Sequence, residues 1–132
     1  MSGSLPEFER QPHRRAKGGV AETEAASYLE RCGFRILARN VVTHAGEIDL
    51  VASEGETLCF VEVKARASAR FGPAIAAIGR EKQRRLARAA SLYLLRHPWS
   101  GPCRFDALGL DAGPHGWTIT LVRDAFQVAA TS

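Results

Sequence analysis

The sequence predicts a layered α/β domain with a mixed β-sheet, and three observations lead to this class. Apolar residues recur at helical spacing near residues 20–32 and 74–97. Five segments rich in β-forming residues fill much of the remaining chain, three before the second helix and two after it. The 132 residues, 45% hydrophobic and 24% charged, suit one globular domain. This order favours a central sheet flanked by helices.

The N-terminal part is expected to contain a tail and one helix. Residues 1–17 are polar, basic and proline-containing, so we expect a flexible tail ahead of a single domain at residues 18–132. A helix is expected over residues 20–32, where Ala21, Ala25 and Leu29 recur at helical spacing. Gly33 follows, and glycine is the usual residue just past a helix end.

Three strands are expected at residues 34–42, 47–53 and 57–65. The connection between the second and third is very short, which predicts an antiparallel hairpin. Gly55 and Glu56 suit a two-residue type II′ turn, because glycine stands first. Such a turn pairs Glu54 with Thr57 and thereby sets the register of the whole hairpin.

A second helix is expected over residues 74–97, ended by His97 and Pro98. Its apolar stripe consists of Leu86, Ala90, Tyr93 and Leu94. It is also strongly basic, through Arg80, Lys82, Arg84, Arg85 and Arg88. Two late strands are expected at residues 103–110 and 117–122, separated by a turn over residues 111–116.

Charge and cysteine content narrow the setting in which the protein acts. The formal net charge of +4 favours nucleic acid or another polyanion as partner, with an arginine-rich solvated surface as the alternative. Cys32, Cys59 and Cys103 stand singly without zinc-binding spacing, which favours a reducing compartment and buried thiols. No apolar run has the length of a membrane span and no signal-peptide core is present, so we expect a cytoplasmic protein without membrane contact.

The predicted hairpin brings acidic and basic side chains together. Counting outward from its turn places Asp49 opposite Glu62 and Glu47 opposite Lys64. Strand side chains alternate between faces, so these polar residues share one face of the hairpin. The other face is apolar, where Ile48 meets Val63 and Leu50 meets Val61, with Ala52 beside them. A slip of one residue would destroy both matches.

Two opposed carboxylates repel each other in a strand interior unless a cation offsets their charge. Mg²⁺ binds one or two carboxylates together with water and phosphate oxygens, and the carbonyl of Val63 offers a further oxygen. The ammonium of Lys64 on the same face can hold the attacking water and stabilise charge that develops on phosphorus. These residues suggest phosphodiester hydrolysis. The alternative is an ordinary polar strand face in which Lys64 pairs with Glu47.

Asp49 followed by Glu62-Val63-Lys64 resembles the PD-(D/E)XK nuclease signature, and residues 18–126 resemble the YraN-like family of bacterial endonuclease-like proteins. The matching stretches are Glu22, Ala25, Tyr28-Leu29, residues 33–40, 46–50 and 60–66, Phe71-Gly72, Lys82, residues 103–106 and residues 124–126. Ala21 departs from the family, which usually has glycine there. The resemblance implies a restriction-endonuclease-like core, α-β-β-β-α-β, similar to Holliday-junction resolvases.

The resemblance also implies roles for individual residues. Asp49 and Glu62 would bind Mg²⁺ or Mn²⁺, Lys64 would assist catalysis, and Glu22 matches an acidic helical position near the metal. The alternative interpretation of Glu22 is a solvent-facing helix residue. Three basic residues, Arg66, Lys82 and Arg39, would contact nucleic acid, although a solvated surface is the default for each.

The leading hypothesis is a Mg²⁺- or Mn²⁺-dependent endonuclease acting on DNA, with branched or repair intermediates suggested by fold analogy alone. A second hypothesis is a nucleic-acid-binding module that keeps the nuclease fold but turns over little or nothing. A third is an adaptor that docks through its basic helix. The sequence leaves open whether the protein forms a homodimer.

Overall fold

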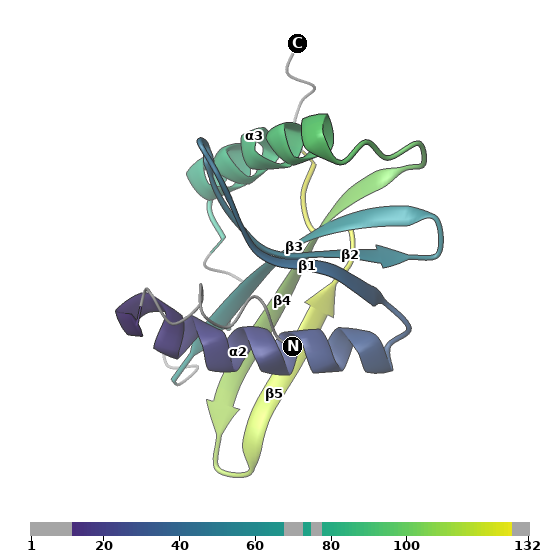
Figure 1. Cartoon of the computed structure of the whole chain (residues 1–132). Helices are drawn as coiled ribbons and strands as arrows, with labels where there is room; N and C mark the ends of the chain where they lie inside the picture. Colours follow the sequence, from purple (N-terminus) through teal and green to yellow (C-terminus); the bar gives the residue numbers. More distant parts are fainter. Residues whose placement is uncertain (1–11, 68–72, 75–77, 128–132) are drawn as a thin grey trace.

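A computed structural model describes residues 12–67, 73–74 and 78–127. The elements in chain order are α2 (Pro12–Arg31), β1 (Arg35–Thr43), β2 (Gly46–Glu54), β3 (Thr57–Arg66), α3 (Arg80–Arg96), β4 (Cys103–Gly113) and β5 (Gly116–Val122) (Figure 1). The expected α-β-β-β-α-β order, followed by one more strand, is confirmed.

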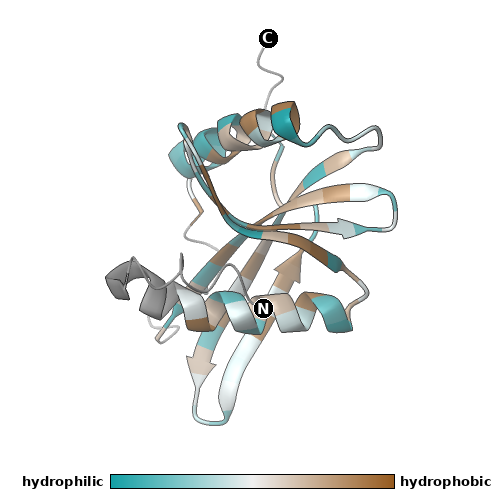
Figure 2. Cartoon of the chain, in the orientation of Figure 1, coloured by the Kyte–Doolittle hydropathy of each residue, from teal (hydrophilic) through white to brown (hydrophobic). Residues whose placement is uncertain are grey.

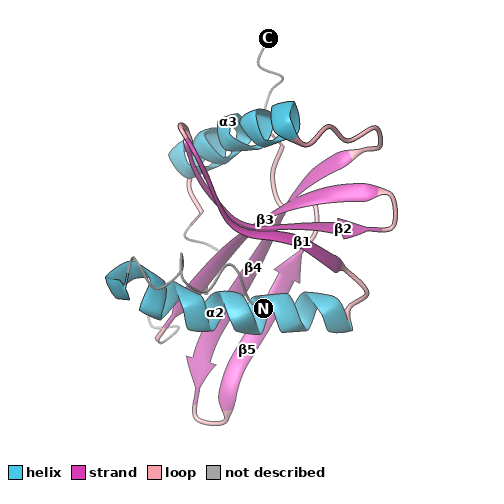
Figure 3. Cartoon of the chain, viewed as in Figure 1, coloured by secondary structure: helices cyan, strands magenta, loops and turns pink. Residues whose placement is uncertain are grey.

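The five strands form one mixed sheet in the order β1-β2-β3-β4-β5. Only β3 and β4 are parallel, and the other neighbours are antiparallel. Parallel neighbours need a long crossover, which here contains α3. Figure 3 shows the sheet between the two helices, as the sequence predicts.

Several boundaries differ from those expected. The helix α2 already includes Pro12, so residues 12–17 of the expected tail are helical, and residues 1–11 lie outside the described residues. Its two glycines at 18 and 19 remain within the helix, since a helical glycine costs only about 1 kcal/mol relative to alanine. The helix α3 begins at Arg80 rather than near residue 74, after an extended Gly79. The late turn is shorter, because β4 continues to Gly113.

Each helix covers one face of the sheet and forms its own apolar core. The α2-side core contains Ala21, Ala25, Ala26, Leu29, Phe34, Leu50, Ala52, Cys59, Val61, Leu108 and Leu110. The α3-side core contains Ile48, Val51, Leu58, Phe60, Leu86, Ala89 and Ala90. Figure 2 shows apolar residues along the strands and hydrophilic residues along much of α3. The expected stripe of α3 is therefore confirmed, with Tyr93 and Leu94 packed at its margin.

The predicted register of the β2–β3 hairpin is confirmed from Glu54↔Thr57 to Leu50↔Val61. Gly55 has a φ of 61°, as a glycine-first hairpin turn requires. The pairing ends there, so Asp49 and Glu62 are not partners in the ladder as predicted. The reason lies in the path of β2, which leaves β3 at Asp49.

A kink in two neighbouring strands explains this departure. Asn40 in β1 has a φ of 52°, a left-handed conformation that asparagine tolerates better than most residues. The β1–β2 register includes Arg39↔Leu50 and Val41↔Ile48 but omits the position between them. Ile48 consequently packs in the α3-side core and not with Leu50, which corrects the predicted alternation of β2.

Two further expectations are settled by exposure and helix composition. Cys59 is buried as expected, but Cys32 and Cys103 are exposed, which corrects the prediction of three buried thiols. The physical reason is position, because Cys32 follows the last turn of α2 and Cys103 opens β4. None of the helices in the described ranges has the length and apolar character needed to cross a membrane.

Candidate functional site

The candidate site lies where β2 leaves β3. There the Asp49 side chain takes the place of a strand partner, because its Oδ2 accepts a 2.8 Å hydrogen bond from the Val63 N–H. Asp49 is half-buried, and Glu62, the next residue back along β3, has only 2% of its surface exposed. The two carboxylates that the sequence predicts to meet are thus brought into one site, although by a side-chain contact and not by direct strand pairing.

Burial and mutual repulsion make this site unfavourable for negative charge. The pKa of Glu62 is raised to about 7, first by burial and then by the charge of Asp49. The pKa of Asp49 is raised by burial, while the Val63 N–H and the charge of Lys82 act in the opposite direction. Carboxylates in such surroundings gain most from a nearby cation.

Two ammonium groups act on the pair. The Lys82 Nζ lies 3.0 Å from Glu62 Oε2, with the Lys82 side chain 38% exposed and the Glu62 side chain 3% exposed. Lys64, two residues along β3, contributes a smaller lowering of the Glu62 pKa than Lys82 does. The predicted neighbourhood of Asp49, Glu62 and Lys64 is therefore present in the fold, and Lys82 joins it from α3.

Glu22 reaches this site from the opposite helix. It is 5% exposed, so it is not the solvent-facing residue that was its alternative interpretation. A side-chain hydrogen bond with Glu22 lowers the Asp49 pKa. The acidic groups of the site thus come from α2, β2 and β3, three elements that converge beside the kink.

The donor set can be tested against a divalent cation. Within the described ranges, no three aspartate, glutamate, histidine or cysteine side chains are grouped so as to hold a metal ion between them. Mg²⁺ does not require such a group, because it commonly binds one or two carboxylates and keeps several waters. Asp49 and Glu62 offer hard oxygen ligands whose mutual repulsion a cation would relieve. The residues present therefore fit Mg²⁺ or Mn²⁺ with an open coordination sphere.

Comparison with known proteins places the chain in a family. The model of "Uncharacterised protein family UPF0102" matches residues 21–110. The chain belongs to the UPF0102 family. The YraN-like family expected from the sequence is thereby confirmed. The matched segment of this UPF0102 chain includes Glu22, Asp49, Glu62, Lys64 and Lys82.

Relatives in the UPF0102 family span almost the same length. A UPF0102 protein of Symbiobacterium thermophilum is 47% identical over 115 residues, which cover 86% of this chain and 98% of that protein. One from Burkholderia thailandensis is 44% identical over 120 residues, covering 90% and 81%. One from Herminiimonas arsenicoxydans is 42% identical over 115 residues, covering 86% and 93%. The likeness therefore extends over most of the UPF0102 fold described above.

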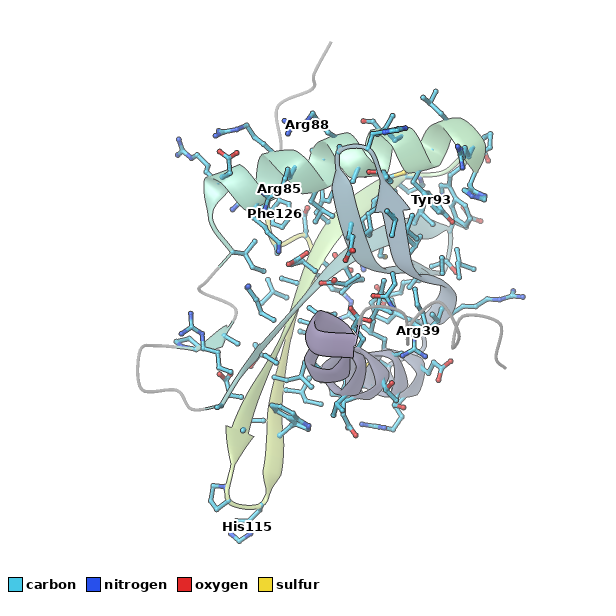
Figure 4. All side chains as sticks on the ribbon, turned by 60° about the vertical axis from the view of Figure 1, so that its left-hand side comes forward. Arg39, Arg85, Arg88, Tyr93, His115 and Phe126 are labelled. Atoms are coloured by element: carbon cyan, nitrogen blue, oxygen red, sulfur yellow. The ribbon has the colours of Figure 1, made fainter. Side chains whose placement is uncertain are left out.

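The remaining predicted site residues, Arg39 and Arg66, differ in how they relate to this UPF0102 site. Arg39 of β1 donates a 3.0 Å hydrogen bond to the Thr23 hydroxyl, directly after Glu22 in α2. Figure 4 shows Arg39 beside that helix. Arg66 ends β3, is half-buried and lies beside Asp111 of β4 in the register. Arg39 thus has a tethering contact within the fold, whereas no contact among the described residues links Arg66 to the carboxylates.

Two features of the UPF0102 site are absent from the sequence-based prediction. Lys82 was expected to face phosphate, yet it contacts Glu62 directly. Asn40 creates the kink beside Asp49, and an asparagine in the middle of an otherwise β-rich segment is the only signal of it.

Proposed function

We propose that this UPF0102 protein is a metal-dependent nuclease of the restriction-endonuclease-like PD-(D/E)XK class that hydrolyses phosphodiester bonds in DNA. The observation that carries the proposal is the meeting of Asp49 and Glu62 at the β2–β3 separation, beside the ammonium groups of Lys64 and Lys82. Two neighbouring carboxyl groups whose pKa values are both raised by burial, beside lysines, are typical of a functional site and unusual for a structural strand.

In this mechanism each residue has a separate task. Asp49 and Glu62 would hold Mg²⁺ or Mn²⁺, which when bound acidifies water and neutralises phosphate charge. The Val63 N–H fixes one Asp49 oxygen at 2.8 Å and so orients the other. The N–H and C=O of one strand residue point to the same side, so the Val63 carbonyl faces the same gap and would be a further oxygen ligand for the metal. Glu22 of α2 is hydrogen-bonded to Asp49 and would help to position it.

Lys64 is the proposed group that positions the attacking water. It stands on the same strand face as Glu62, and its charge reaches that carboxylate. An ammonium there can orient the attacking water and stabilise the charge that develops on the phosphoryl oxygens. Because a charged ammonium cannot accept a proton, the water must lose its proton to solvent or to a neighbouring carboxylate.

The partner proposed for this site is DNA. The net charge is +4, and the outer side of α3 carries the exposed residues Arg80, Arg84, Arg85 and Arg88. Such a basic helix suits the phosphate backbone. Arg66, Lys82 and Arg39 remain proposed phosphate contacts, of which Lys82 alone touches a carboxylate of the site in the described residues. Branched DNA as the substrate rests on fold analogy, and a homodimer would suit a two-fold substrate of that kind.

One observation favours a second candidate, a binding module with little or no turnover. Lys82 already neutralises the charge of Glu62. The described residues also contain no group of three aspartate, glutamate, histidine or cysteine side chains that could hold a metal ion. A protein that only binds DNA would need no more than this internal ion pair to keep its carboxylates stable. The two candidates differ in whether cleavage depends on Asp49 and a divalent cation.

The deciding experiment is cleavage of linear duplex, flap and four-way DNA in Mg²⁺, Mn²⁺ or EDTA. We expect Asp49→Asn to lower the cleavage rate by more than about 100-fold. Mutation of a residue that only supports a metal ligand can already cost about 100-fold, and loss of a ligand should cost more. Lys64→Ala should also abolish cleavage, with DNA binding and folding retained. Glu24→Gln removes an exposed carboxylate from α2 and serves as the control. If the wild type and Asp49→Asn bind DNA equally and neither cuts, the binding module is correct.

A further inference from the structure

Lys82 is a cation built into the acidic site. Its Nζ lies 3.0 Å from Glu62 Oε2, and its charge also lowers the pKa of Asp49. It therefore acts on both carboxylates proposed as metal ligands. Lys64 acts on Glu62 more weakly, and no ion pair between these two residues is present in the described part of the chain.

Of the two partners, only Lys82 has room to move. Glu62 lies in the middle of a central strand with 2% of its surface exposed. Lys82 stands in the first turn of α3 with its side chain 38% exposed, on a long flexible stem that can turn toward water. Its chain neighbours are engaged elsewhere, because Glu81 pairs with Arg84 and Gln83 donates to the Ile78 carbonyl.

We propose that Lys82 is a resident counter-cation that a divalent metal must displace from Glu62. Resting on the proposed function, this assignment gives Lys82 two positions. Without metal, its ammonium keeps the buried carboxylates compatible with the fold. With metal, its ammonium is released to the rim of the site, where a phosphate group would enter. Lys82 thus sets the metal affinity of the site and is a positioning residue.

The physical reason is competition for one oxygen. Glu62 Oε2 accepts a charge-assisted hydrogen bond from the Lys82 ammonium. A metal ion bound at the same oxygen would be repelled by that ammonium. Metal binding therefore includes the loss of the Lys82 contact. Removal of the ammonium should tighten metal binding and, at the same time, weaken the metal-free fold.

The test measures Mn²⁺ binding without DNA, by electron paramagnetic resonance of free Mn²⁺ at pH 8, where protons compete little for the carboxylates. We expect Lys82→Met to bind Mn²⁺ about fivefold more tightly or better, since no charge-assisted contact must be broken. Its melting temperature should be below that of the wild type in EDTA and should recover with Mn²⁺. Lys82→Arg keeps the charge and should bind Mn²⁺ no more tightly than the wild type.

Arg96→Met is the matched control, because it removes one positive charge from an exposed position of the same helix that has no proposed role in binding. It should bind Mn²⁺ like the wild type, which separates the local contact from net charge. If Lys82→Met does not fold in EDTA, Lys82→Gln keeps a hydrogen-bond donor without the charge and serves for the same comparison.

Two results would overturn the inference in distinguishable ways. Equal or weaker Mn²⁺ binding by Lys82→Met, with clear binding by the wild type, would refute the role of Lys82 and leave the proposed metal site intact. Absence of Mn²⁺ binding in the wild type, Lys82→Met and Lys82→Gln alike would refute both this inference and the proposed function.

Discussion

Glu62 shows at the scale of one residue how the site departs from ordinary folding chemistry. Its carboxyl group is almost completely buried, and burial together with Asp49 raises its pKa from 4.5 to about 7. The group therefore retains its proton in the folded protein at pH values where the unfolded chain has lost it. Its ionisation opposes folding in the absence of metal.

The upward shift of the Glu62 pKa predicts how Glu62→Gln changes the stability of the protein with pH. The pKa of Glu62 is higher in the folded state, about 7, than in the unfolded state, 4.5. The contribution of Glu62 to the free energy of unfolding is therefore greatest below pH 4.5 and declines as the pH rises through about 7. Glutamine cannot ionise and can still accept a hydrogen bond from Lys82. We expect the variant to melt a few degrees above the wild type at pH 8 in EDTA, on the order of 2 kcal/mol, with the gap shrinking toward pH 5.

Thermal melting between pH 5 and pH 8 in EDTA provides the measurement. Glu81→Gln, at an exposed position one residue before Lys82, is the control and should show no such trend. A gap between Glu62→Gln and the wild type that stays constant over this range would contradict the prediction.

The residues of the site differ in how far the sequence predicts their contacts. Asp49 and Glu62 are brought near each other by a short hairpin, whose register the turn at Gly55 sets as far as Leu50↔Val61. Contacts between elements that are distant in the sequence are not predicted in this way. The ion pair of Lys82 with Glu62 and the hydrogen bond of Arg39 to Thr23 depend on how each helix is placed on the sheet. One sequence does not specify those placements.

At the scale of elements, the kink in β1 and β2 is what opens the site. Strand alternation predicts Ile48 and Leu50 on one face, because it assumes an even pleat. The left-handed Asn40 breaks that assumption, and Ile48 turns to the α3 side. Asp49 is thereby left out of both ladders and free to accept the Val63 N–H through its side chain. The element types were predictable, but the irregularity beside the candidate site was not.

A second polar group ties strands together far from this kink. Arg104 of β4 contacts Asp106 at 2.8 Å and Glu54 of β2 at 2.6 Å. Arg123, after β5, contacts the same Glu54 at 2.7 Å. These arginines lower the Glu54 pKa to about 2, so its stabilising contribution is present above pH 4.5 and is lost as pH falls toward 2.

The two arginines of this group should differ strongly in their effect on stability. Asp106 is completely buried, so Arg104→Met leaves an uncompensated buried charge and should cost about 3–5 kcal/mol. Arg123 is 46% exposed, and Arg123→Met should cost less than about 1 kcal/mol. Urea unfolding of both variants measures the difference. Equal losses would show that Asp106 does not depend on Arg104.

At the scale of the whole molecule, the two helices differ in what they offer to a partner. The carboxylates Asp49 and Glu62 lie under the beginning of α3, to which Lys82 belongs. The same helix carries exposed arginines on its outer side, and Figure 4 shows Arg85 and Arg88 along it. Arg85 also lies near Gly46 in the β1–β2 hairpin, close in sequence to Asp49. A DNA backbone that follows α3 would thus pass the proposed site.

This arrangement predicts that the salt dependence of DNA binding arises from the arginines of α3 and not from the net charge of the protein. Each lysine or arginine that contacts a phosphate contributes roughly one unit to the slope of log K against log salt. The double variant Arg85→Gln/Arg88→Gln should therefore bind four-way or duplex DNA in EDTA with a slope smaller by about two. Arg35→Gln, exposed at the start of β1, should leave the slope almost unchanged. If all these proteins share one slope, DNA does not follow α3, and the basic helix is better explained as a docking face for another protein.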